Sequence, residues 1–111
     1  MTVDQHQGGR TIARSLTALH ERPGHAWDLA TMAEAAGMSR SGFTARFKEL
    51  IGEPPAEYLL RWRISIAQGL LRGGMPLKAA ASQLGYSAPS LSRAFSQVVG
   101  LSPRDWIKRT A

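Results

Sequence analysis

The chain has 111 residues, with 14 Lys and Arg, eight Asp and Glu, and a formal net charge of +6. This length fits one compact domain or two very small ones, and no apolar run is long enough to span a membrane. The first ten residues lack the apolar stretch of a signal peptide, and the absence of cysteine excludes disulfide and thiolate chemistry. We therefore expect a cytoplasmic protein with no membrane partner.

Helix punctuation and apolar spacing predict an all-α chain of about seven helices. Residues typical of caps and stops, above all Ser, Asp, Gly and Pro, separate stretches with apolar residues at helical spacing. No stretch alternates apolar and polar residues long enough to form a strand. The first predicted helix ends before Pro23, and the others cover about residues 28–37, 39–52, 55–72, 76–85, 87–100 and 102 onward.

The two halves of the chain differ in charge. Residues 1–57 carry six Lys and Arg against seven Asp and Glu, whereas residues 58–111 carry eight basic residues and one acid. No carboxylate side chain occurs between Tyr58 and Arg104. Because a solvated helical surface normally mixes both signs, this stretch indicates a polyanionic partner.

The chain contains one structural unit twice. When the sequence is shifted by 48 residues, positions 29–59 align with 77–107 without a gap, and seven of the 31 positions are identical. The matches are turn residues and core candidates, which is the pattern of a repeated supersecondary structure. The identical pairs are Leu29 and Leu77, Ala33 and Ala81, Gly37 and Gly85, Ser39 and Ser87, Phe47 and Phe95, Gly52 and Gly100, and Pro55 and Pro103.

Each copy has the spacing of a helix-turn-helix. Two steeply crossing helices need a small residue where they approach, a turn residue that tolerates a positive φ angle, and an apolar anchor on the second helix. The first copy supplies Ala33, Gly37 and Phe43. The second copy repeats the spacing with Ala81, Gly85 and Leu91.

The second helix of each copy, at about residues 40–51 and 88–99, is the predicted recognition helix. Helical periodicity predicts these inward residues: Phe43, Phe47, Leu50, Ile51, Leu91, Phe95, Val98 and Val99. The opposite faces carry small polar residues around one central arginine, which suits a helix lying between phosphate-lined groove walls. The outward residues are Ser41, Gly42, Ala45 and Lys48, with Thr44 at the edge, and Pro89, Ser90, Arg93, Ser96 and Gln97.

Together these segments resemble the DNA-binding domain of the AraC/XylS family of transcription regulators. The resemblance covers roughly residues 10–109 and is carried by LATMAEAAGMSRSGFTARFKELIGEPPAEYL, RWRISIAQGLL and AAASQLGYSAPSLSRAFSQVVGLSPRDWI. The ending G-x-S-P-x-x-aromatic, from Gly100 to Trp106, is characteristic of the family. The resemblance implies a sequence-specific regulator that inserts both recognition helices into adjacent major-groove segments of double-stranded DNA.

We divide the chain into a flexible N-terminal segment (1–9), a first helix-turn-helix subdomain (10–54), a long linker helix (55–73) and a second subdomain (74–111). Family members usually add an effector-binding or dimerisation domain, which we do not expect within 111 residues. If the protein is an activator, RNA polymerase is the expected protein partner. We expect no catalytic residue, metal or cofactor.

The resemblance also assigns contacts by position. The family's base contacts fall on Ser41, Thr44, Ala45, Ser90 and Arg93, its phosphate contacts fall on Arg40 and Arg61, and Lys48 and Gln97 complete the outward faces. Ala45 departs from the family, in which a longer polar residue is common, and it can offer DNA only a methyl contact. Arg93 is therefore the predicted main reader, because arginine reads guanine through two hydrogen bonds.

Two other classes of function have less support. An enzyme would need a nucleophile, a phosphate-binding loop or a metal site, but His6, His20 and His25 stand without cysteine or a carboxylate cluster. A helical protein-interaction module could use Trp27, Trp62 and Trp106 as a docking patch, although each lies where core or boundary packing is expected. The exclusion of acids from one stretch favours DNA over a protein partner.

Overall fold

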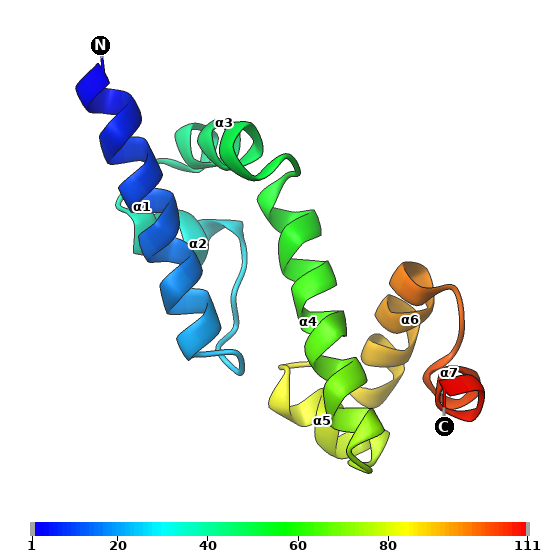
Figure 1. The fold of residues 1–111 in the computed structure, drawn as a ribbon. Coiled ribbons are helices and arrows are strands. Elements are labelled where there is room, and N and C mark those ends of the chain that lie inside the picture. The colour runs from blue at the N-terminus through cyan, green and yellow to red at the C-terminus, as the bar shows by residue number, and fades with distance from the viewer. Residues whose placement is uncertain (1, 111) are drawn as a thin grey trace. The chain divides into compact units, whose positions relative to one another are not determined.

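The structure is a computed structural model that describes residues 2–110, with side chains from residue 9 onward. The described residues form seven helices and no strand, which confirms the predicted all-α fold class (Figure 1). The helices are α1 (Thr2–Glu21), α2 (Leu29–Ala36), α3 (Arg40–Ile51), α4 (Pro55–Arg72), α5 (Leu77–Gln83), α6 (Ala88–Val99) and α7 (Pro103–Thr110). None of the helices in this part of the chain is both long and apolar enough to cross a membrane.

The chain divides into two compact units, and the boundary lies inside α4. Unit 1 ends at Leu59 and unit 2 begins at Leu60. The helix predicted as a linker therefore supplies residues to both units, since its apolar residues recur at helical spacing along its whole length. At the start of unit 1, α1 begins at Thr2, earlier than residue 10, where the first subdomain was predicted to begin.

Unit 1 is built around the contact of α1, α2 and α3. Buried Ser15 of α1 donates a hydrogen bond of 2.8 Å to the carbonyl of Met32 in α2, so its hydroxyl is satisfied inside the core. Ala33 is 2% exposed, which confirms the small residue expected where the helices approach. The buried apolar residues of unit 1 are Ile12, Leu19, Trp27, Met32, Ala33, Ala36, Phe43, Phe47 and Leu59.

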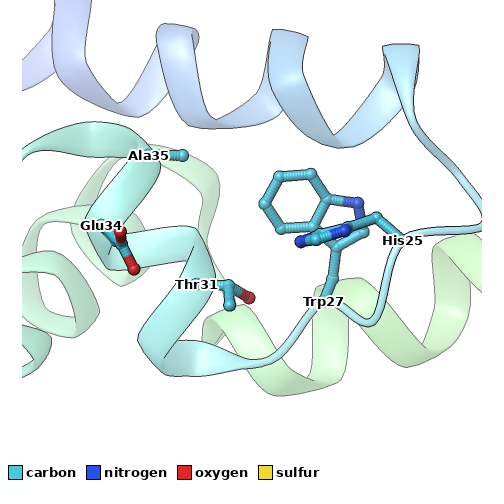
Figure 2. Close-up of a pocket in the computed structure, with 5 residues that line it drawn as sticks. All are labelled: His25, Trp27, Thr31, Glu34 and Ala35. Atoms are coloured by element: carbon cyan, nitrogen blue, oxygen red, sulfur yellow. The ribbon is translucent and has the colours of Figure 1, made fainter.

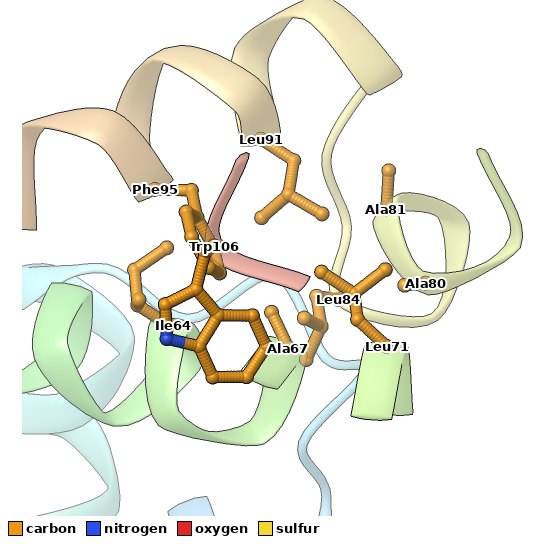
Figure 3. Close-up of a cluster of buried hydrophobic side chains, with 9 residues drawn as sticks. All are labelled: Ile64, Ala67, Leu71, Ala80, Ala81, Leu84, Leu91, Phe95 and Trp106. Atoms are coloured by element: carbon orange, nitrogen blue, oxygen red, sulfur yellow. The ribbon is translucent and has the colours of Figure 1, made fainter. Parts of the chain in front are cut away.

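Unit 2 has a core of the same kind, shown in Figure 3. Ala81 is 1% exposed and stands in for Ala33 of unit 1. The cluster combines one face of α4 with residues of α5, α6 and α7, so the last helix packs as part of the unit (Figure 3). Its members are Ile64, Ala67, Leu71, Ala80, Ala81, Leu84, Leu91, Phe95 and Trp106.

The two turns are closed by the same pair of main-chain hydrogen bonds. In unit 1, the amides of Gly37 and Met38 donate to the carbonyls of Glu34 and Ala33 at 2.9 and 3.0 Å. In unit 2, the residues 48 positions later make the same bonds at 3.3 and 2.8 Å, from Gly85 to Ser82 and from Tyr86 to Ala81. Both glycines have a positive φ, 68° and 79°, and each turn is therefore a Schellman closure.

An aromatic pair is repeated at the same offset. The rings of Phe47 and Tyr58 meet edge to face at 5.4 Å and 70°, and those of Phe95 and Trp106 at 5.5 Å and 68°. The Tyr58 hydroxyl also lies 3.2 Å from Nε2 of His20 in α1. Burial raises the pKa of Tyr58, and the negative charge of Glu53 raises it further. The two ring pairs show that the repeat extends from the turns to the packing of individual rings.

The inward prediction is wrong at the ends of both recognition helices. Leu50 and Ile51 are 48% and 38% exposed, and Val98 is 36% exposed. Periodicity gives the face of the helix on which these residues lie, but not whether neighbouring segments cover its last turn.

Candidate nucleic-acid interface

α3 and α6 begin and end in the same way. The side chain of Ser39 accepts the amide of Gly42 at 3.2 Å, and the side chain of Ser87 accepts the amide of Ser90 at the same distance. Gly52 and Gly100 end the helices in the left-handed conformation, and each amide donates to the carbonyl four residues earlier at 2.8 Å. Capping fixes the start of each helix, and therefore which residues face outward.

The exposed face of α3 is narrow and short. Ser41, Ala45 and Lys48 are exposed, as expected, and Thr44 is half-buried at the edge. Lys48 lies in the last turn, where a positive charge is favourable near the helix C-terminus. Gly42 has no side chain, and a Cβ there would lie 3.0 Å from Oγ of the cap residue Ser39. Small groups therefore dominate the outward face between Ser41 and Ala45.

Arg46 of α3 is mostly buried and engaged in an ion pair. Its Nη1 forms an ion pair of 3.0 Å with Oε2 of Glu49, and its side chain is only 18% exposed. The side chain of Glu49 is 63% exposed and occupies the position that corresponds to Gln97 in α6. Glu49 was not among the residues predicted from the sequence, although its spacing of three from Arg46 is a signal for a pair within one helix.

The exposed face of α6 carries longer side chains. Pro89, Arg93 and Gln97 recur every fourth residue and are all exposed. Ser90 is half-buried, and its Oγ accepts a 2.8 Å hydrogen bond from the hydroxyl of Ser87. Ser90 therefore supports the cap as well as facing outward. Arg93 is the sixth of the 12 residues in α6, so its side chain leaves the helix near the middle.

Arg40 interacts electrostatically with the start of α2. It is exposed at the first position of α3, where a cation opposes the positive end of the helix dipole. Asp28, the N-cap of α2, has a lowered pKa mainly because its carboxylate accepts the amide of Thr31, with the charge of Arg40 as a smaller cause. Asp28 is thus part of the electrostatic surroundings of Arg40.

The other cations of unit 2 serve two different purposes. Arg63 and Arg72 of α4 lie over the rings of Tyr86 and Trp106, at 5.7 and 5.0 Å from the ring centroids, and so contribute to packing. Arg61, the expected phosphate contact on α4, is exposed. Further exposed cations, noted in sequence only as part of the charge asymmetry, are Lys78, Arg104, Lys108 and Arg109.

A shallow pocket of about 300 Å³ lies in unit 1 beside α2, lined by His25, Trp27, Thr31, Glu34 and Ala35 (Figure 2). Its polar groups are mostly engaged in local structure. The indole of Trp27 donates to the carbonyl of Arg22 at 2.7 Å, the hydroxyl of Thr31 completes the capping box with Asp28, and His25 meets the Trp27 ring edge to face. We interpret the pocket as a consequence of how the turn before α2 is built.

The tryptophans do not form the docking patch considered for an interaction module. Trp27 and Trp106 are each only 6% exposed, within unit 1 and unit 2 respectively, and Trp62 is half-buried. Among the residues whose side chains are described, no three His, Cys, Asp or Glu are grouped as metal ligands would be. His6 lies outside the residues whose side chains are described.

A family model described as a helix-turn-helix domain matches residues 32–109, which include both turns and both recognition helices. The chain belongs to the AraC-type helix-turn-helix family. A putative AraC-like transcription regulator of Streptomyces antibioticus is 48% identical over 99 residues, covering 87% of this chain and 33% of the relative. The activator RclR of Escherichia coli is 35% identical over 91 residues, covering 80% and 32%. The chain spans about a third of the length of these relatives.

Solved structures of AraC-type domains share the fold. The DNA-binding domain of the transcriptional factor AdpA, solved in complex with a target DNA, superposes with a TM-score of 0.82 at 29% identity, covering 88% of this chain and 90% of that one. An AraC-type regulator from Chromobacterium violaceum gives a TM-score of 0.79 at 20% identity, covering 93% and 94%. The family is one of DNA-binding transcription regulators, as the resemblance in the sequence implied.

Proposed function

We propose that this chain recognises duplex DNA through its two recognition helices, α3 and α6, as the DNA-binding part of a transcription regulator. The observation that carries the proposal is Arg93, a fully charged donor exposed at the middle of α6. The exposed face of α6 contains no acid, and Asp105 is the one acid in residues 58–111. AdpA, whose DNA-binding domain has the same fold, was solved with its target DNA, and this supports the same use of the fold here.

The residues of the two faces have different roles in this proposal. Arg93 reads a guanine through its two major-groove acceptors, and Gln97 and Ser90 contact neighbouring bases. Ser41, Thr44 and Ala45 face bases in the first segment of the site. Arg40, Lys48 and Arg61 contact phosphates, which contributes affinity without sequence preference.

The same proposal covers the partners of the whole regulator. RNA polymerase is the protein partner if the regulator activates transcription, and the place of action is the cytoplasm. We assign no residue a catalytic role and no cofactor, because the exposed groups suit recognition of an anionic duplex rather than bond making.

Binding to duplex DNA as a function of salt tests the proposal. Displacement of counterions from about six phosphates would give a log–log slope of affinity against salt near −5. A slope near zero would contradict DNA binding. The specific site is obtained by selection from a random duplex pool, and a scrambled duplex of the same composition is the control.

Two arginine variants separate base reading from phosphate contact. Arg93→Ala should cost about 1–3 kcal/mol on the selected site and relax the preference at one base pair, because a guanine loses two hydrogen bonds. Arg61→Ala should weaken binding to selected and scrambled duplexes equally and flatten the salt slope by about one. If Arg93→Ala lowers both affinities by the same factor, Arg93 contacts phosphate and the assignment of the reader is wrong.

A further inference from the structure

We infer that α3 recognises its segment of the site through the 5-methyl groups of thymine, with Ala45 as the specificity-determining residue. This inference rests on the proposed function and assigns a ligand group to the first recognition face. Ala45 is exposed near the middle of α3, at the position that corresponds to Arg93 of α6. Its Cβ methyl is the whole of its side chain.

The neighbours of Ala45 leave room for a close approach. Ser41, one turn earlier, is exposed and short, and Gly42 has no side chain. Arg46, the residue after Ala45, is paired with Glu49 at 3.0 Å, and its side chain is only 18% exposed. Between Ser41 and Ala45 the outward face therefore carries no long side chain, so this part of α3 can lie close to the floor of a groove.

The chemistry of this face selects one group on the groove floor. The hydroxyls of Ser41 and Thr44 both donate and accept, so by themselves they do not distinguish one base from another. A methyl group makes no hydrogen bond, and the 5-methyl of thymine is the apolar group that the major-groove edge of a base pair presents. A cytosine or guanine edge at that place would leave polar atoms against the methyl of Ala45, which costs affinity. The face therefore prefers a thymine.

Replacing thymine by deoxyuridine removes only this methyl group and retains the base pairing. Each thymine of the selected site is replaced in turn. The base pair at which Arg93→Ala relaxes the preference is left out of this series. For the unaltered protein, at least one replacement in the α3 segment should weaken binding about fourfold, the factor for one methyl group lost from an apolar contact. This affinity measurement changes only the DNA, so it does not depend on whether a protein variant folds.

Two variants connect the effect to Ala45. In Ala45→Gly the ratio of the thymine to the deoxyuridine affinity should fall to about one. Ala13→Gly, at an exposed helical position of α1, carries the same helix-propensity cost and should keep the fourfold ratio. Circular dichroism melting of both variants shows that each is folded at the temperature of the binding measurement.

The outcomes separate this inference from the proposed function. A ratio near one at every thymine, with preference for the selected site retained, overturns the inference and leaves the proposed function standing. A fourfold ratio that persists in Ala45→Gly overturns the role of Ala45. Equal affinity for the selected and scrambled duplexes overturns the proposed function, and this inference with it.

Discussion

α3 and α6 are built alike on the side that packs and differ on the side that is exposed. Their caps, their closing glycines and the aromatic ring behind each helix match at an offset of 48 residues. At the outward positions, Ser41, Ala45 and Glu49 of α3 stand where α6 has Pro89, Arg93 and Gln97. The comparison teaches that the packed face of this unit is constrained by geometry, while the exposed face is free to take up different chemistry.

The largest test of this comparison is the removal of the buried rings that correspond in the two units. Phe47→Ala and Phe95→Ala should each destabilise their unit by about 3–5 kcal/mol, because both side chains are fully buried against a second ring. Hydrogen exchange resolved by helix measures the loss separately for the two units. Loss of protection in one unit only would show that the repeated core has unequal energetic weight.

The control for that test uses the apolar residues that the structure leaves exposed. Leu50→Ala and Val98→Ala remove apolar side chains from the last turn of α3 and α6, where they are 48% and 36% exposed. Both variants should change the free energy of unfolding by less than about 0.5 kcal/mol. A cost comparable to that of the phenylalanine variants would place these residues in the core after all.

A smaller effect is expected at the caps, where the two units differ slightly. Ser39→Ala and Ser87→Ala should each cost about 1 kcal/mol, because an amide at the start of the helix loses its acceptor. Ser87→Ala should cost the more of the two, since Ser87 also donates to Oγ of Ser90 at 2.8 Å. Chemical denaturation measures both changes, and an equal cost would show that the additional hydrogen bond contributes nothing.

The smallest expected effect is a pH dependence confined to unit 1. Because the pKa of Asp28 is lowered below its ordinary value of 3.8, its contribution to stability is fully present above that pH and is lost as the pH falls through the lowered value. The corresponding N-cap of α5 is Pro76, which does not titrate. Denaturation between pH 5 and 2 should therefore show the extra acid sensitivity in α2, and Asp28→Asn should remove it.

Much of the fold could be predicted because the residues at the helix ends of this chain are of the types that caps and turns require. Ser39, Ser87 and the glycines at positive φ stand at the caps and turns where the sequence placed them. Burial at the ends of α3 and α6 could not be predicted, since periodicity gives the face on which Leu50 and Val98 lie but not which segments cover that part of the face. The sequence predicted α4 as a linker helix, but not its share in the cores of both units, because a spacing typical of a connecting helix is also that of a core helix.

For the candidate site, the sequence predicted which side of α3 and of α6 is outward, but not how the side chains pair. Ser41, Ala45, Arg93 and Gln97 are exposed, as periodicity predicts. The pairing of Arg46 with Glu49 and of Arg72 with Trp106 depends instead on side-chain geometry that one sequence does not contain. Counting cations therefore overstated how many are available to phosphate. Which of the exposed residues touches a base stays a prediction until the variants above are measured.

The Schellman closure of both turns has a consequence for how such a domain can change over generations. The bonds that hold the crossing run between main-chain atoms, from Gly37 and Met38 to α2 and from Gly85 and Tyr86 to α5. No residue of either outward face takes part in them. Substitutions at positions 41, 45, 89 or 93 can therefore accumulate almost independently of folding, so that binding preference drifts while the scaffold is inherited unchanged.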